Sequence, residues 1–194
     1  MKTTRRKAKN GTAFSKEAIK SLKQTGALTA TSRYSVEKML AKIDFSQDLT
    51  IVELGVGNGA VTKAIMEHLG PNSRLIALEI NENMYRLALN ALRPDHRVQI
   101  AHHSAFELSD LLKSLGIDKV DVIVSTLPLT MFKKENNDRL MAQIRAHLKP
   151  NGQYIQIQYS PIKYPLIKRY FPKVKIQVAL ANFPPALLFF CYLR

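Results

Sequence analysis

A strand that ends in a glycine-rich turn and opens directly into a helix constrains the fold of this chain more than any other feature. The segment runs Val52-Glu53-Leu54-Gly55-Val56-Gly57-Asn58-Gly59-Ala60. Glycines at alternate positions allow backbone torsions that other residues avoid, and they let a ligand lie against the main chain. The turn therefore predicts a nucleotide-like cofactor. Because Gly55, Gly57 and Ala60 also fit the G-x-G-x-x-G/A dinucleotide fingerprint, the loop alone leaves the identity of the cofactor open.

The rest of the chain alternates apolar strands with helices. We expect helices over 33–43, 60–69, 82–92 and 136–148, and strands over 50–54, 74–80, 97–101, 120–125, 153–159, 174–180 and 187–192. Strands that are apolar on both faces and separated by helices predict a mostly parallel sheet covered on both sides. The last two strands have no helix between them, which predicts an antiparallel hairpin at the edge of the sheet. The expected fold class is α/β.

The net charge of +14 is unevenly distributed along the chain. Residues 1–24 hold eight Lys and Arg with one acid, residues 25–138 hold twelve with fourteen acids, and residues 139–194 hold nine with none. Two basic ends around a near-neutral middle indicate a polyanionic partner, either a nucleic acid or an anionic membrane surface.

Composition and cysteine content narrow the possible classes of protein and its expected location. The chain has 194 residues, of which 46% are hydrophobic, and this excludes a disordered or collagen-like protein. One cysteine, Cys191, cannot form a disulfide framework or a zinc finger, so a reducing, cytoplasmic location is expected. No apolar run of signal-peptide length follows the basic N-terminus, and Pro184-Pro185 interrupts the one long uncharged stretch. We therefore expect contact with a membrane only from its surface.

Residues 1–24 are expected to form a basic tail and an amphipathic helix ahead of a domain over 25–194. Within 12–24, four apolar residues share one arc of a helix and three lysines line the other side; they are Phe14, Ala18, Ile19 and Leu22, and Lys16, Lys20 and Lys23. Two interpretations stay open, an ordinary surface helix that packs on the body and an interfacial helix that lies on anionic headgroups.

Two carboxylates beside the glycine loop indicate which cofactor groups are recognised. Glu53 stands where it would repel a pyrophosphate but attract a cationic amino-acid group. Glu79 ends the next strand, where it can accept hydrogen bonds from both hydroxyls of a ribose. His102 and His103 lack Cys or acidic partners at metal-ligand spacing, so we expect packing or surface histidines and no metal site.

Five segments together resemble the bacterial phospholipid N-methyltransferases of the soluble class I type, which depend on S-adenosylmethionine. They are residues 26–32, 52–59, 125–129, 159–161 and 182–186, and the match is collinear from about Lys23 to the C-terminus. The E-x-G-x-G-x-G run resembles motif I of class I methyltransferases. The chain departs from the family at Ala30, where Pro is frequent, at Ser160, where Gly is usual, and at Ser104, where Asp is common.

The resemblance implies a Rossmann-like fold with a seven-stranded sheet. It also implies methyl transfer from S-adenosylmethionine, with S-adenosylhomocysteine as product, to the amine of phosphatidylethanolamine at the inner face of the membrane. The cofactor-binding residues that it implies are Gly26, Thr31, Ser32, Glu53, Gly55, Gly57, Gly59, Glu79, Ser104, Ala105 and Ser125. The substrate nitrogen would be held by Ser125, by the carbonyls of Leu127 and Pro128, and by Tyr159, whose ring could face the forming quaternary ammonium.

Plainer alternatives stay open for several of these residues and for the reaction. Tyr159 could be a core tyrosine, and Leu127-Pro128 an ordinary turn. Thr31 and Ser32 could form a helix N-cap before Arg33, and Glu53 and Glu79 could be solvated helix-capping acids. A ribosomal RNA or DNA adenine methyltransferase would also suit the charge, but Ser125 and Leu129 stand where such enzymes carry Asn or Asp and an aromatic for the flipped base. A binding module that keeps the cofactor loop without catalysis is a third possibility, and the oligomeric state is open.

Overall fold

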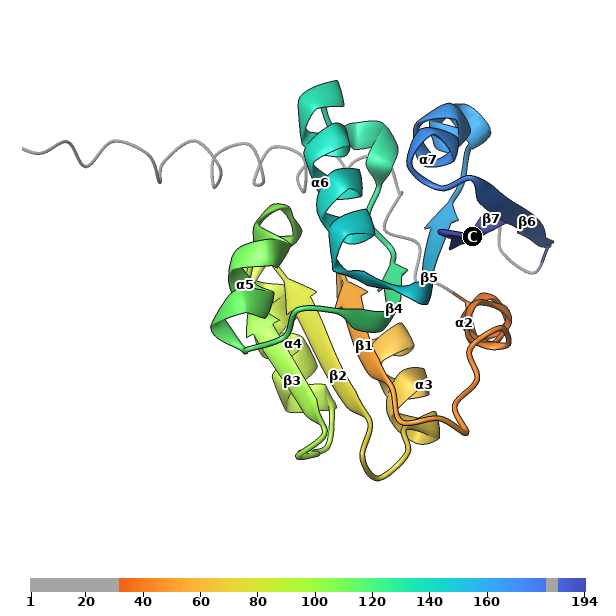
Figure 1. The fold of residues 1–194 in the computed structure, drawn as a ribbon. Coiled ribbons are helices and arrows are strands. Elements are labelled where there is room, and N and C mark those ends of the chain that lie inside the picture. The colour runs from red at the N-terminus through yellow and green to blue at the C-terminus, as the bar shows by residue number, and fades with distance from the viewer. Residues whose placement is uncertain (1–31, 181–184) are drawn as a thin grey trace, which may run out of the picture. The chain divides into compact units, whose positions relative to one another are not determined.

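A computed structural model of the chain describes residues 32–180 and 185–194 (Figure 1). The expected basic tail and amphipathic helix over 1–24 lie outside the described residues, as do Gly26, Thr31 and most of the segment 182–186.

Seven strands form one sheet in the order β3-β2-β1-β4-β5-β7-β6 (Figure 1). Their bounds are β1 (Thr50–Leu54), β2 (Arg74–Glu79), β3 (Val98–His102), β4 (Val120–Ser125), β5 (Leu148–Gln158), β6 (Lys173–Ala179) and β7 (Ala186–Tyr192). Strands β1 to β5 are parallel, and β7 inserts antiparallel between β5 and β6. The predicted mostly parallel sheet with a C-terminal antiparallel hairpin is confirmed.

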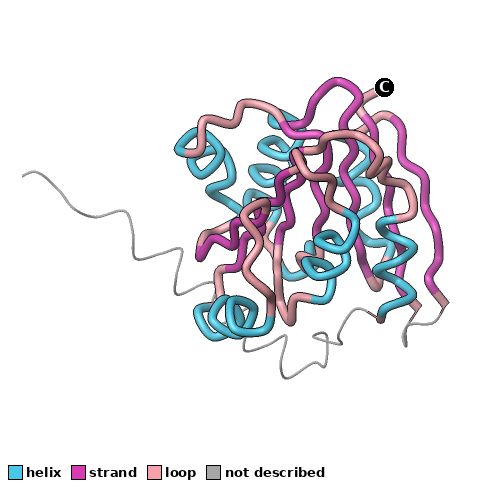
Figure 2. Tube along the Cα trace, turned by 90° about the horizontal axis from the view of Figure 1, so that it is seen from below, coloured by secondary structure: helices cyan, strands magenta, loops and turns pink. Residues whose placement is uncertain are grey.

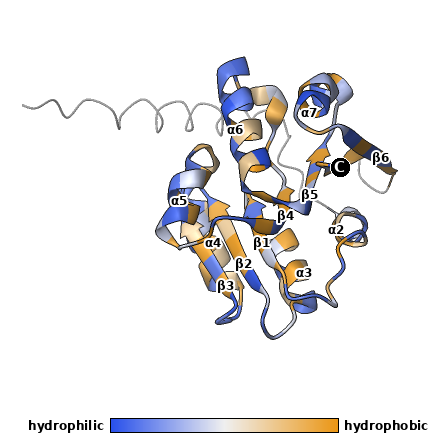
Figure 3. Ribbon diagram, in the orientation of Figure 1, coloured by the Kyte–Doolittle hydropathy of each residue, from blue (hydrophilic) through white to orange (hydrophobic). Residues whose placement is uncertain are grey.

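Helices cover both faces of the sheet (Figure 2). They are α2 (Arg33–Leu40), α3 (Ala60–His68), α4 (Glu82–Ala91), α5 (Leu108–Ser114), α6 (Lys134–His147) and α7 (Tyr164–Tyr170). One apolar cluster joins the sheet to α5, α6 and α7, through Leu108, Leu140 and Ile167 among others. A second cluster joins the other face to α2, α3 and α4. The hydropathy colouring follows this arrangement, with orange strands inside and blue on the outer sides of the helices (Figure 3). In the described parts of the chain, no helix is long and apolar enough to cross a bilayer.

Two helices were not predicted from the sequence, and both are short. Helix α5 has seven residues and buries Leu108, Leu111 and Leu112, while α7 has seven residues with Pro165 in its first turn. A helix of two turns shows too little of the 3.6-residue period to be recognised by pattern. Strand β5 also begins earlier than predicted, at Leu148, and its register with β4 shifts between the pairs of Val120 and Val122.

The single cysteine lies inside the sheet. Cys191 of β7 is fully buried, opposite Tyr154 of β5 on one side and Val174 of β6 on the other. Burial raises the pKa of its thiol well above the ordinary value.

Candidate cofactor and acceptor site

The glycine loop turns sharply at the carboxyl end of β1. Gly55, Gly57 and Gly59 have φ values of 91°, 56° and 79°, in the left-handed region that favours glycine. The Gly55 amide donates to the Leu78 carbonyl at 2.9 Å, which holds the turn against β2. A Cβ added at Gly55 would stand 3.0 Å from Thr126 Oγ1, whereas one added at Gly57 would meet none of the described residues within 4 Å. Gly57 therefore borders open space, as a loop that cradles a ligand requires.

Glu79 fixes the glycine loop to the turn that begins α4. Its Oε2 accepts a hydrogen bond from the Gly57 amide at 2.9 Å, and its Oε1 accepts one from the Asn81 amide at 2.8 Å. Asn81 in turn caps α4 by accepting from the Met84 amide. Each carboxylate oxygen has a further lone pair, so both backbone bonds can persist while Glu79 accepts from a ligand hydroxyl. This position suits the predicted ribose contact.

Glu53 is a carboxylate buried beside Thr62. Its side chain is fully buried, and among the described residues no donor lies within hydrogen-bond distance of either oxygen. Burial raises the pKa of Glu53 to about 8; neighbouring Thr62 opposes the rise, and the charge of Glu79 adds to it. An unpaired acid of this kind would be stabilised in its charged form by a nearby cation. The site therefore fits the cationic amino-acid group of the predicted cofactor.

The variant Glu53→Gln is expected to flatten the pH dependence of stability between about pH 4.5 and pH 8, the ordinary and the folded pKa values of this group. The folded protein keeps a proton here that the unfolded chain releases, so wild-type stability falls as pH rises through this window. The slope is at most about 1.4 kcal/mol per pH unit. Urea unfolding at intervals across the window measures it.

The matched control is Glu67→Gln, which removes an exposed carboxylate from α3, the helix that also carries Thr62. This control is expected to retain the wild-type slope. A wild-type protein whose stability is as flat across the window as that of Glu53→Gln would contradict the prediction.

Residues 125–129, which we call the acceptor loop, begin at the last residue of β4 and are hydrogen-bonded to the glycine loop. The Thr126 amide donates to the Leu54 carbonyl at 3.1 Å, and the Thr126 hydroxyl donates to the Gly55 carbonyl at 2.8 Å. Ser125 is fully buried, and its Oγ accepts from the Leu127 amide at 3.3 Å. The predicted cofactor loop and the predicted substrate loop therefore have a fixed relative position.

Two buried glutamines that the sequence reading missed hold the acceptor loop from β5. Gln156 and Gln158 each donate from Nε2 to the Leu127 carbonyl, at 3.0 and 2.9 Å. The Leu129 amide donates to the same oxygen at 3.0 Å. The Pro128 carbonyl accepts from the Met131 amide at 2.9 Å. Both carbonyls proposed to hold the substrate nitrogen thus already have donors, and a substrate amine would have to share them.

Ser125 and Tyr159, the two side chains predicted to hold the substrate, do not lie on one face of the sheet. Ser125 is in register with Gln156, whose partner Tyr154 belongs to the cluster under α5, α6 and α7. Tyr159 is half-buried and packs against the other cluster, under α2, α3 and α4. Ser125 and Tyr159 could therefore contact the same substrate only beyond the ends of their strands.

The remaining predicted cofactor residues within the described chain cap short helices. The Ser32 hydroxyl accepts from the Ser35 amide at 3.2 Å as the N-cap of α2. The Ser104 hydroxyl accepts from the Phe106 amide at 3.2 Å and begins a 3₁₀ turn at Ala105, which is buried. Their contacts with a cofactor stay predictions.

The two histidines make ordinary surface contacts. The exposed His102 ring lies 3.0 Å from the Ile80 carbonyl, 3.3 Å from a Glu82 carboxylate oxygen, and stacks on Tyr85. His103 contacts the Ser104 carbonyl at 3.2 Å. Among residues 32–180 and 185–194, no three His, Cys, Asp or Glu side chains are grouped so that they could hold a metal ion.

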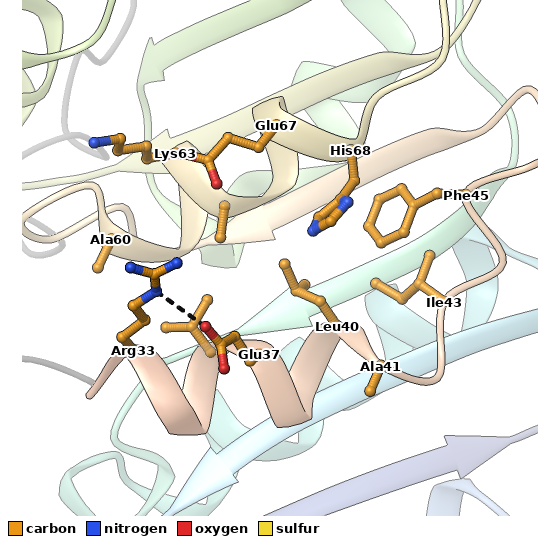
Figure 4. Close-up of a pocket in the computed structure, with 12 residues that line it drawn as sticks. Arg33, Glu37, Leu40, Ala41, Ile43, Phe45, Ala60, Lys63, Glu67 and His68 are labelled. Carbon is orange, nitrogen blue, oxygen red and sulfur yellow. Dashed lines mark hydrogen bonds and ion pairs between the residues drawn. The ribbon is translucent and has the colours of Figure 1, made fainter.

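A groove of about 730 Å³ lies between α2 and α3 (Figure 4). Its lining is mixed: Val36, Leu40, Ile43 and Ala64 are apolar, and Arg33, Glu37, Lys63 and Glu67 are charged. It also reaches Ala60, the first residue after the glycine loop. This groove could not be predicted from the sequence, because its walls come from two helices that a strand separates along the chain.

The comparisons with known proteins agree with this geometry. Residues 51–152 match the family described as methyltransferase domain. The ornithine lipid N-methyltransferase of Singulisphaera acidiphila is 29% identical over 166 residues, which is 85% of this chain and 86% of that protein. The ribosomal RNA small subunit methyltransferase H of Clostridium botulinum is 23% identical over 104 residues, 54% of this chain and 34% of that protein.

Among solved structures, the fold is similar to that of the Burkholderia thailandensis 1,6-didemethyltoxoflavin-N1-methyltransferase with bound 1,6-didemethyltoxoflavin and S-adenosylhomocysteine. The TM-score is 0.70 at 16% identity, covering 98% of this chain and 92% of the other. Family and fold confirm S-adenosylmethionine as the predicted cofactor. Since the family match covers more than half of the chain, the protein belongs to the methyltransferase domain family and is a class I S-adenosylmethionine-dependent methyltransferase.

Proposed function

We propose that the protein methylates the amine of a membrane lipid. The observation that carries this proposal is the similarity to an ornithine lipid N-methyltransferase over 85% of the chain. The two basic ends favour a partner with an anionic surface. The groove between α2 and α3 reaches Ala60 next to the glycine loop, and the apolar part of its mixed lining could hold part of an aliphatic chain. Phosphatidylethanolamine, predicted from the sequence, and ornithine lipid are the two acceptors to compare.

The chain's own groups would bind and orient both reactants. Bound S-adenosylmethionine supplies an electrophilic methyl group. Glu53 and Glu79 are placed to recognise its cationic and ribose parts, and the acceptor loop positions the substrate nitrogen, by Ser125 and Tyr159 in this proposal. Such positioning carries most of the catalysis in a direct displacement. An alkylamine has a pKa near that of lysine, about 10.4, so the site must also favour the neutral amine, and desolvation acts in that direction.

Methylation of a nucleic acid is the second candidate, supported by the net charge of +14 and by the ribosomal RNA methyltransferase among the relatives. Two features of the acceptor loop weigh against it. Ser125 has no amide or carboxylate, and Leu129, at the position of the expected aromatic, is fully buried. The loop therefore offers neither the usual contact for a base amine nor a stacking surface at that position.

The deciding experiment offers labelled S-adenosylmethionine with three substrates in parallel: vesicles that contain phosphatidylethanolamine, vesicles that contain ornithine lipid, and total RNA. We expect label in at least one lipid and none in RNA, and mass spectrometry of the product counts the methyl groups. Label in RNA alone would refute the proposal. Intact binding of S-adenosylhomocysteine without transfer to any substrate would favour the non-catalytic binding module.

Peripheral association with an anionic membrane is part of the same proposal. Each Lys or Arg near such a surface contributes about 1 kcal/mol, so the basic residues in 1–24 suffice for salt-sensitive binding. Sedimentation with anionic vesicles, with and without residues 1–24, measures their share.

A further inference from the structure

Three apolar side chains project from the outer edge of the sheet. Ile176, Val178 and Leu180, which we call the edge patch, are 44%, 45% and 74% exposed. Ile176 and Val178 occupy alternate positions and therefore share one face of β6, and Leu180 stands in the turn directly after the strand. Strand β6 is the edge strand on one side of the sheet (Figure 1). Proteins usually protect such an edge with charges, and an exposed apolar edge indicates an interaction site.

Cations and one aromatic ring lie on the opposite face of β6 from the edge patch and along the backbone of that strand. Lys173 and Lys175, earlier in β6, are exposed. From α2, Lys38 donates to the Val178 carbonyl at 3.3 Å and lies 4.6 Å from the centre of the Tyr34 ring. The last part of the chain, 139–194, contains no acid. A strand with aliphatic side chains on one face and lysines on the other is typical of amphipathic elements that rest in the interface of an anionic bilayer.

The topology places the edge patch at the same end of the sheet as the acceptor loop. Strand β6 is antiparallel to β7, which is antiparallel to β5, so β6 runs in the direction of the parallel strands. Its carboxyl end therefore lies at the end where the glycine loop and the acceptor loop leave β1 and β4. Ile162, which is 72% exposed, follows the carboxyl end of β5 and so lies at the same end of the sheet.

We propose that the edge patch inserts into the headgroup layer of an anionic membrane and turns the catalytic end of the sheet toward the lipid amine. The proposal rests on the proposed lipid substrate and specifies how that substrate is reached. A nucleic acid would leave these aliphatic side chains without a partner, since single strands bind on aromatic rings and cations.

Vesicle sedimentation with the full chain tests the edge patch, with phosphatidylglycerol and phosphatidylethanolamine in the vesicles. We expect Leu180→Asp and Ile176→Asp each to weaken binding about tenfold, because burial of one such side chain is lost. The matched control is Leu87→Asp on α4, where the side chain is 52% exposed at the β2 and β3 end of the sheet. It introduces the same charge and is expected to leave binding unchanged. Thermal unfolding of each variant checks that the fold is retained.

Three outcomes would overturn the proposal. The first is that both edge-patch variants bind vesicles as tightly as the wild type. The second is that Leu87→Asp loses as much vesicle binding as they do. The third is that the edge-patch variants keep vesicle binding but change their oligomeric state in gel filtration. The last would mean that β6 pairs with a second copy. Methyl transfer to a short-chain, water-soluble amino lipid separates this proposal from the proposed function. If the wild type fails to methylate any amino lipid while the edge-patch variants alone lose vesicle binding, the membrane contact stands and the substrate assignment fails.

Discussion

Replacing Gly57 with leucine is expected to weaken the binding of S-adenosylhomocysteine by at least about a hundredfold, because a bulky side chain would fill the space in which the cofactor is cradled. Within residues 32–180 and 185–194, a Cβ at Gly57 meets no atom within 4 Å, so the new side chain extends into the open space bordered by the loop. Isothermal titration calorimetry measures the affinity without depending on the methyl acceptor. An affinity equal to that of the wild type would remove the glycine loop from the site.

The matched control for this prediction is Gly116→Leu. Gly116 has a φ of 67° and, like Gly57, open space around an added Cβ. Both variants place a leucine in a left-handed conformation, which costs about 1–2 kcal/mol. The two proteins are therefore expected to lose similar stability in urea, while only Gly57→Leu loses binding. Equal losses of binding would show that strain, and not occupation of the cradle, is responsible.

Replacing Gln158 with methionine is expected to lower kcat for methyl transfer about tenfold to a hundredfold, while the KM for S-adenosylmethionine changes little. The substitution preserves side-chain length but removes the 2.9 Å bond to the Leu127 carbonyl. The acceptor loop would then be held less firmly, and misplacement of a reacting group by about 1 Å can cost a hundredfold in rate. Steady-state kinetics with a water-soluble amino lipid separates kcat from KM.

Gln153→Met serves as the control on the same strand. Gln153 is also buried, but it donates to the Tyr192 hydroxyl at 2.6 Å, away from the acceptor loop. Each variant loses one buried hydrogen bond, worth about 1 kcal/mol. Both are expected to lose similar stability, and only Gln158→Met to lose turnover. A matching fall of kcat in Gln153→Met would assign the effect to β5 as a whole.

The parts of the site that sequence could predict are local. Glycines at 55, 57 and 59 and the acid at 79 act through backbone torsions and strand ends, which a short segment already determines. The role of Gln156 and Gln158 could not be predicted in this way. The run Ile155-Gln156-Ile157-Gln158 alternates like a half-exposed strand, and the glutamines become buried only when β7 pairs with β5 and helices cover that face.

The sequence alone also could not predict that Ser125 and Tyr159 lie on opposite faces of the sheet. Which residue of β5 stands beside Ser125 depends on the register of the two strands, and the irregular pairing near Val120 and Val122 shifts that register. A displacement by one residue moves a side chain to the opposite face. The fold class needed no such detail, because alternation of apolar strands with helices is enough to favour a parallel sheet.

The burial of Cys191 between two strands makes the folded protein inert to thiol reagents. The sequence has no other cysteine, and deprotonation of this thiol is strongly disfavoured. The rate at which such a reagent labels the native chain therefore reports how often β7 separates from its neighbours. Because the native cysteine does not react in the folded protein, it need not be removed before site-directed labelling. A single cysteine introduced at the exposed position 180 can carry a spin label whose accessibility to lipid-soluble and water-soluble relaxants gives its depth in a bilayer.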